Sequence, residues 1–168
     1  MTNFDGIVSW VLRFEDSTLS GVVKNLGDGG GLTRFGITQQ SHPELDPIFW
    51  TNMACSDALE TAKQVYKNEY WNPIQGDNLP SDDLASVLMD FSVNSGVRRA
   101  VKTLQTILQI PKDGILGPGT LNAVNNYSGD LASDLRQARV TFLESLGGEY
   151  ETELVKRAKL IYPDNGGI

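Results

Sequence analysis

Glu15 and the glycine-rich stretch that follows it contain the residue types that carboxylate chemistry needs. Glu15 ends an apolar helical segment beside Phe14, Asp28 comes 13 positions later in a run of glycines, and Thr33 follows five positions after Asp28. Glycoside hydrolysis uses a carboxylic acid that protonates the leaving oxygen and a second group that stabilises positive charge or activates water. The spacing fits such a pair, with the Thr33 hydroxyl holding the water. A solvated surface glutamate and a plain glycine turn remain the alternative.

The composition excludes several other kinds of chemistry. The chain has 14 Lys and Arg against 21 Asp and Glu, a net charge of -7, which argues against nucleic-acid binding and a polybasic membrane anchor. One histidine, His42, and one cysteine, Cys55, are too few for an ordinary structural zinc site. We expect no metal and no cofactor, a structural role for His42, and a buried, unreactive Cys55.

The apolar spacing predicts a mainly α chain with one small β-hairpin. Ser81 is expected to cap a helix, Gly96 to end it, and Pro118 to lie in the first turn of another. The hairpin is expected from residues 21–24 and 32–35. The predicted helices cover about residues 4–15, 57–71, 82–94, 97–108, 118–125 and 131–146, with a last one that ends near 161.

Charge divides the chain into two regions of different character. Residues 1–95 carry 5 basic and 13 acidic residues, whereas residues 96–168 carry 9 and 8. We expect these to be two regions of one compact unit. No apolar run is long enough for a membrane span, and no basic segment precedes the first apolar stretch. The sequence therefore predicts no membrane insertion and no secretory signal peptide.

Several motifs resemble, in order, those of the glycoside hydrolase family 108 muramidases, which cleave bacterial peptidoglycan. The stretch Asp28-Gly29-Gly30-Gly31-Leu32-Thr33-Arg34-Phe35-Gly36-Ile37-Thr38 is similar to the family's Asp-Pro-Gly-Gly-x-Thr-x-x-Gly-Ile-Thr. Tyr70-Trp71, Asp77-Asn78-Leu79-Pro80 and Met89 to Gly96 resemble its Tyr-Trp, Asp-x-Leu-Pro and Phe-Asp-x-Ala-Val-Asn-x-Gly. Residues 100–120 are similar to its peptidoglycan-binding-like part. Glu15 is followed by Asp16 to Gly21 rather than by the family's Gly-Gly-Tyr, and the stretch from Glu15 to Asp28 is about four residues longer.

The resemblance implies a lysozyme-like α+β fold, with a muramidase region over residues 1–95 and a helical peptidoglycan-binding-like region over residues 96–168. It marks Glu15 as the general acid for hydrolysis of the β-1,4 bond between N-acetylmuramic acid and N-acetylglucosamine. Asp28 and Thr33 are expected to assist it. The candidate substrate-binding residues are Arg34, Tyr70, Trp71, Asp90 and Asn94.

Each candidate binding residue has a structural alternative. Arg34 pairs with Glu15 or Asp28, or is a plain surface arginine. Asp90 and Asn94, one helical step apart, line the cleft or form a structural polar pair. The aromatic rings either stack on sugars or belong to the core: Trp50, Tyr70 and Trp71.

The predicted partner is bacterial peptidoglycan, and the predicted state is a monomer. Localisation is expected in the host cytoplasm before holin-type or other assisted release to the wall, as for a phage or prophage endolysin. The alternatives are a catalytically weakened peptidoglycan-binding or virion structural protein, and a cell-wall amidase or peptidase. The second is disfavoured because the sequence lacks its metal ligands and nucleophile.

Overall fold

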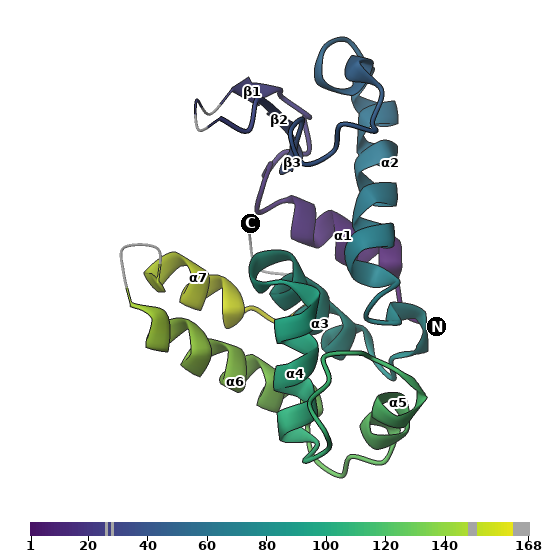
Figure 1. The fold of residues 1–168 in the computed structure, drawn as a ribbon, viewed down its shortest axis with the longest axis vertical. Coiled ribbons are helices and arrows are strands. Elements are labelled where there is room, and N and C mark those ends of the chain that lie inside the picture. Colours follow the sequence, from purple (N-terminus) through teal and green to yellow (C-terminus); the bar gives the residue numbers. More distant parts are fainter. Residues whose placement is uncertain (26, 28, 148–150, 163–168) are drawn as a thin grey trace. The chain divides into compact units, whose positions relative to one another are not determined.

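The computed structural model describes residues 1–25, 27, 29–147 and 151–162, and the chain divides into two units. One unit contains residues 1–7 and the described residues from 68 onward, and the other contains residues 8–67. The helix α1 (Phe4–Leu12) begins in the first unit and continues into the second. The predicted fold class is confirmed: most of the regular structure is helical, and the strands form one small antiparallel sheet (Figure 1).

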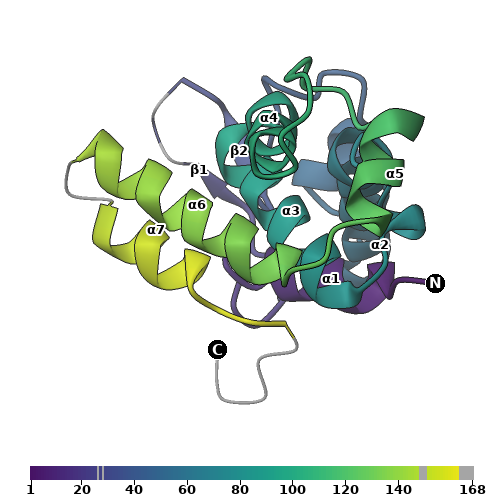
Figure 2. The ribbon, with the colours of Figure 1, turned by 90° about the horizontal axis from the view of Figure 1, so that it is seen from below.

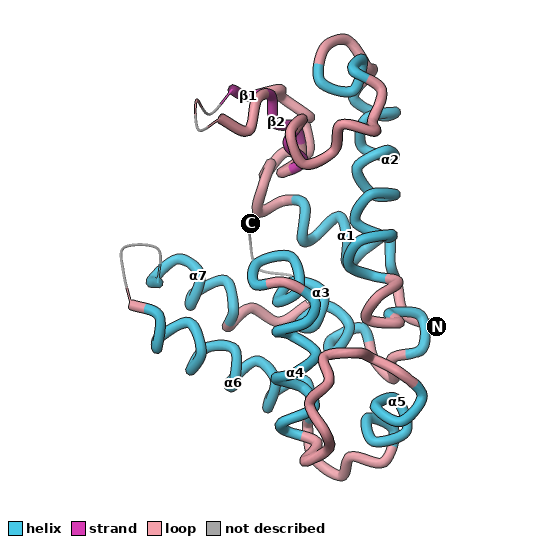
Figure 3. The backbone as a smooth tube through the Cα atoms, in the orientation of Figure 1, coloured by secondary structure: helices cyan, strands magenta, loops and turns pink. Residues whose placement is uncertain are grey.

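The sheet belongs to the unit of residues 8–67 and has the order β1-β2-β3. Its strands are β1 (Lys24–Asn25), β2 (Leu32–Arg34) and β3 (Ile37–Thr38), which Figure 3 shows as short segments between longer loops. Thr33 pairs with Lys24 on one side and with Thr38 on the other. The predicted two-stranded hairpin is therefore incomplete. The third strand forms because Phe35 and Gly36 both have positive φ, which allows a two-residue turn between β2 and β3.

Two further elements complete this unit: the 3₁₀ helix η1 (Pro47–Trp50) and the α-helix α2 (Cys55–Tyr66). The side chain of Asp46 caps η1 by accepting a hydrogen bond from the Ile48 amide. The buried apolar residues of the unit come from α1, the sheet, η1 and α2. The helix predicted over residues 57–71 begins two residues earlier as α2 and ends as a π-helical turn, η2 (Lys67–Trp71).

The other unit is helical and is organised around α3 (Asp82–Ser95), which is buried from Leu84 to Ser92. Helix α3 packs against α4 (Val97–Ile107) and α6 (Leu131–Leu146), and α6 packs against α7 (Glu151–Ala158). Figures 1 and 2 both show α6 and α7 side by side. The remaining elements of this unit are the short 3₁₀ helix η3 (Gly76–Asn78) and the α-helix α5 (Pro118–Asn125).

Helix ends in this unit follow local chemistry. The Ser81 hydroxyl accepts a hydrogen bond from the Leu84 amide at 3.2 Å, which confirms the predicted cap of α3. Gly96 ends the same helix with φ +85°, a conformation that costs glycine little. The predicted last helix ends at Ala158 rather than near residue 161. No helix in the described part of the chain combines the length and apolar character needed to cross a membrane.

A buried charge cluster joins three helices of this unit. Asp90 on α3 is fully buried, and its Oδ2 lies 2.6 Å from Nη1 of Arg139 on α6. Its Oδ1 accepts a hydrogen bond of 2.9 Å from Nε of Arg157 on α7. Burial lowers the pKa of Arg139, and the charge of Asp90 opposes that effect. Asp90 therefore compensates two cations that would otherwise be costly to bury.

Candidate active site

Glu15 is carried by a tight turn at the end of α1. After Leu12 the chain makes two short backbone hydrogen bonds, from the Glu15 and Asp16 amides to the Leu12 carbonyl, at 3.0 and 2.9 Å. The predicted helix therefore ends earlier than residue 15, and Glu15 lies in the turn as an exposed residue. Its side chain lies against Gly36, because a Cβ added to Gly36 would be 3.0 Å from Cγ of Glu15.

The turn at Gly36 is fixed from α2. The Tyr66 hydroxyl donates a hydrogen bond of 3.1 Å to the Phe35 carbonyl, and Phe35 is buried at 3% exposure. A Cβ on Gly36 would also lie 2.9 Å from the Tyr66 hydroxyl oxygen. Gly36 is therefore needed both for its φ of +76° and for the close approach of Glu15 and Tyr66.

Asp16 closes the loop that follows Glu15. Its carboxylate accepts hydrogen bonds from the Gly21 amide at 2.6 Å and from the Thr18 amide and hydroxyl and the Ser20 hydroxyl at 3.1–3.3 Å. Burial raises the pKa of Asp16, but the hydrogen bonds, led by that from Gly21, outweigh it and leave the pKa below its ordinary value. Asp16 is thus held as a carboxylate whose two oxygens already have donors.

These elements enclose a hollow of about 110 Å³. Glu15 and Thr33 both line it, so the structure brings two of the three predicted catalytic residues together. Asp28, the third, lies outside the described residues. The other lining residues are Asp16, Val22, Lys24, Phe35 and Gly36. The hollow is smaller than a typical ligand pocket, so its volume suits one reacting group rather than a whole saccharide.

Sequence reasoning did not single out Asp16 or Lys24 as members of this hollow. Asp16 follows Glu15 directly, and the Asp-x-Thr-x-Ser-Gly spacing after it is typical of a turn closed by side-chain hydrogen bonds. Lys24 enters through its pairing with Thr33 across the sheet, and that register is set by tertiary structure. In the part of the chain that the structure describes, no group of three or more His, Cys, Asp or Glu residues is arranged to hold a metal ion.

Arg34 has a structural position in the same unit. It is 6% exposed, and its Nη1 donates hydrogen bonds to the backbone carbonyls of Phe49 at 2.8 Å and Met53 at 3.1 Å. The surface-arginine alternative is therefore wrong. The guanidinium holds the loop around η1 against β2, because it satisfies carbonyls that lie away from water.

Trp50 and Trp71 are buried, at 2% and 0% exposure. The Trp50 ring nitrogen donates to the Ile37 carbonyl at 3.2 Å, and that of Trp71 donates to Oδ1 of Asp77 at 3.1 Å. Fully buried rings have no free face for a sugar, so the structure places both in the core rather than at a stacking position. Tyr70 is partly exposed, and its role in sugar stacking stays a prediction.

Asp90 and Asn94 belong to the helical unit. Asn94 donates a hydrogen bond of 2.8 Å to the Asp90 carbonyl and one of 3.4 Å to its Oδ1. With Asp90 fully buried against two arginines, the geometry favours the structural polar pair over a role in lining a cleft. Substrate binding by Asn94, which is partly exposed, stays a prediction.

His42 and Cys55 make local contacts. Nδ1 of His42 lies 3.1 Å from Oε1 of Glu44 two residues along the chain. Cys55 is exposed, so the prediction that it is buried is wrong. Its thiol donates to the carbonyls of Leu19 and Ser20 at 3.4 and 3.1 Å, because it begins α2 beside the loop that Asp16 closes.

Comparisons with known proteins agree with this architecture. The family model described as Glycosyl hydrolase 108 matches residues 8–96, which is more than half of the chain and includes every described residue of the hollow. Among solved structures, the chain is similar to the structure of Brucella abortus SagA, at 29% sequence identity and a TM-score of 0.71, over 92% of this chain and 88% of that one. No curated protein matches the chain significantly. The chain belongs to the glycosyl hydrolase 108 family, and at family level it is a glycoside hydrolase of the peptidoglycan-cleaving kind.

Proposed function

We propose that the protein is an N-acetylmuramidase that cleaves the β-1,4 bond between N-acetylmuramic acid and N-acetylglucosamine, with Glu15 as the general acid. The observation that carries the proposal is the hollow that Glu15 shares with Thr33. Glu15 lies in a turn where it is exposed to solvent, yet its stem is held against Gly36. A positioned but accessible carboxyl group is what proton transfer to a leaving oxygen requires.

The other residues of the proposed site stabilise charge and orient water. Both oxygens of Asp16 are occupied by donors of its own loop, so Asp16 supplies fixed negative charge beside the developing positive charge rather than a nucleophile. The hydroxyl of Thr33 lines the hollow and orients the attacking water. Asp28 is the proposed second carboxylate of the pair, since the Asp16 oxygens are already engaged.

The protein acts on bacterial peptidoglycan as a monomer and reaches the wall from the host cytoplasm through holin-type or other assisted release, as a phage or prophage endolysin does. A bacteriolytic role follows from cleavage of the glycan strand.

The test is digestion of purified peptidoglycan by the wild-type protein and by Glu15→Gln. New reducing ends that become muramicitol on borohydride reduction identify the muramidase bond. Glu15→Gln keeps the size of the side chain but cannot donate the proton. We therefore expect the rate of bond cleavage to fall by about 10²-fold or more. Glu60→Gln is the matched control, because Glu60 is an exposed residue of α2 whose ion pair within the described chain is with Lys63, outside the hollow.

Three results would contradict the proposal. Binding to peptidoglycan without any new reducing end would favour the catalytically weakened binding protein. New free amines without reducing ends would identify an amidase or peptidase. Reducing ends on glucosamine instead of muramic acid would show that the other glycosidic bond is cleaved.

A further inference from the structure

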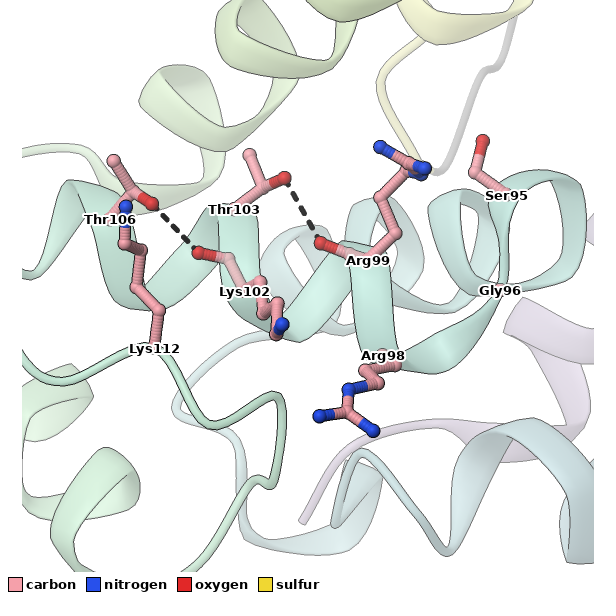
Figure 4. A pocket seen from close by; sticks show the side chains of 8 residues that line it. All are labelled: Ser95, Gly96, Arg98, Arg99, Lys102, Thr103, Thr106 and Lys112. Atoms are coloured by element: carbon pink, nitrogen blue, oxygen red, sulfur yellow. Dashed lines mark hydrogen bonds between the residues drawn. The ribbon is translucent and has the colours of Figure 1, made fainter.

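A second hollow, of about 660 Å³, lies along α4 and shares no residue with the candidate active site. Its charged lining residues are all cations: Arg98, Arg99, Lys102 and Lys112. Figure 4 shows the Arg99 side chain projecting to one side of α4 and that of Arg98 to the other. The segment of residues 91–112 contains no Asp or Glu, in a chain whose net charge is -7. Positive charge is therefore concentrated here against the overall charge.

The described residues leave these cations without an ion-pair partner. The salt bridges among the described residues involve other side chains, and none of the four cations takes part in one. Asp113 is the nearest acidic residue in the sequence, and it is turned toward Gln105 and the Ile115 amide, at 2.7 and 2.9 Å. The hydrogen bond from Gln105, then that from Ile115 and, more weakly, the charge of Arg98 lower the pKa of Asp113. Asp113 therefore offsets part of one charge but does not line the hollow.

The loop that carries Lys112 is held against α4 by one buried side chain. Gln105 is 1% exposed, and its Nε2 donates to Oδ1 of Asp113 at 2.7 Å and to the Ile115 carbonyl at 3.1 Å. Its Oε1 accepts from the Gly114 amide at 2.9 Å. Because one amide group satisfies both sides of the loop, the wall of the hollow is formed before any ligand arrives.

Packing contacts also hold the side chains of Arg98, Arg99 and Lys102 in place. A Cβ on Gly114 would lie 2.6 Å from Cγ of Arg98 and 3.3 Å from Cγ of Lys102, so both stems pack across this glycine. The guanidinium carbon of Arg99 lies 4.6 Å from the centre of the Phe142 ring. Stacking of this kind restrains the guanidinium plane and leaves its edge of N–H donors available.

We propose that this hollow is a binding site for a phosphate-bearing ligand. Phosphate carries up to two negative charges and several acceptor oxygens on one centre, which suits Arg98 and Lys102, one helical turn apart with both stems packed across Gly114. Arg99, on the other side of α4, and Lys112, in the loop, line the same hollow and suit a second phosphoryl group. The arginine forks bind phosphate oxygens in pairs, and the lysines add point charges. A single carboxylate would leave most of this charge uncompensated. The phosphate comes either from a lipid headgroup or from a soluble phosphate or phosphodiester, and the recognition chemistry is the same.

The test measures binding of inorganic pyrophosphate to the full chain by titration calorimetry, so its outcome does not depend on glycan cleavage. We expect saturable binding that weakens with salt, and a loss of about tenfold or more in R98Q/K102Q. R99K keeps the charge but loses the fork, and is expected to bind more weakly than the wild type. K156Q/K159Q is the matched control, because it removes two charges from α7 and the residue after it, outside the hollow.

Further arms identify the source of the phosphate. Sedimentation with phosphatidylglycerol vesicles, reduced in R98Q/K102Q, supports the lipid headgroup. Binding of soluble polyphosphate without vesicle binding supports the soluble source. The proposal is overturned if pyrophosphate does not bind, if R98Q/K102Q binds it as the wild type does, or if citrate binds as tightly as pyrophosphate. Thermal melts of each variant exclude loss of folding as the cause.

Discussion

Gly36→Ala tests whether the position of Glu15 matters for activity. The added Cβ would lie 3.0 Å from Cγ and 3.3 Å from Cδ of Glu15, and 2.9 Å from the Tyr66 hydroxyl, all closer than ordinary contact at 3.4 Å. Tyr66 is buried and bonded to the Phe35 carbonyl, whereas Glu15 is exposed. The exposed Glu15 side chain can move away by about 0.4 Å or more, and the Tyr66 hydroxyl has to shift by about 0.5 Å, so the turn that carries Glu15 loses its defined position.

Gly36→Ala should lower both the stability of the fold and the rate of catalysis. Alanine at φ +76° costs about 1–2 kcal/mol of backbone strain, which lowers Tm by roughly 2–8 °C in a chain of this length. Displacement of a catalytic group by 1 Å costs about 10²-fold in rate, so a shift of half that size should cost roughly tenfold. The fall in activity should thus exceed anything that the small loss of folded protein causes at 25 °C.

The assay measures release of reducing ends per folded molecule, with folding followed by thermal melts of the same samples. Gly147→Ala is the control, because Gly147 also has positive φ, +62°, and nothing lies within 4 Å of its added Cβ. We expect Gly147→Ala to lose stability but to keep its activity per folded molecule. Full activity in Gly36→Ala, with Tm lowered as expected, would refute Glu15 as a positioned general acid.

Two further substitutions test the electrostatics of each unit. Asp16 has a pKa below its ordinary 3.8, because its hydrogen bonds, led by that from Gly21, outweigh the effect of burial. The ionised Asp16 therefore stabilises the fold above about pH 3.8, and this stabilisation is lost as the pH falls through the lower pKa of the folded protein. Asp16→Asn should flatten that fall in melts between pH 7 and pH 2, and parallel curves for the two proteins would contradict it. Asp90→Asn leaves Arg139 buried without its counter-charge and should cost about 3–5 kcal/mol in denaturant unfolding. Asp83→Asn, at a pair whose aspartate is one-third exposed, should cost about 1 kcal/mol or less, and equal losses would show that the Asp90 cluster is not special.

The helices could be predicted where local chemistry decides the ends. Ser81, Gly96 and Pro118 mark helix ends through caps and fixed φ, and the structure agrees at each. The segment after Tyr66 could not be predicted in this way, since the apolar period of an α-helix and that of one π-helical turn are alike over five residues. The third strand was missed because two residues of strand carry no periodicity.

The candidate active site was predictable in its residue types but less so in its neighbours. The glycine pattern indicated a turn beside Thr33, and Thr33 does line the hollow with Glu15. The positions of Arg34, Trp71 and Cys55 were not predictable, because each depends on whether partners from distant segments cover the side chain. Arg34 is buried because its guanidinium donates hydrogen bonds to the backbone carbonyls of Phe49 and Met53. No local pattern in the sequence encodes those contacts.

The departure from the family pattern after Glu15 does not by itself disrupt the site. The residues in question, 16–21, form a loop closed on the Asp16 carboxylate and held at Leu19 and Ser20 by the Cys55 thiol. Because donors of the same loop satisfy the Asp16 carboxylate, the residues that differ from the family pattern are accommodated before the chain enters β1. Lys24 then pairs with Thr33 in register, and Glu15 and Thr33 line one hollow. The entropic cost of closing a loop grows only slowly with its length, so a longer connection is compatible with an active enzyme.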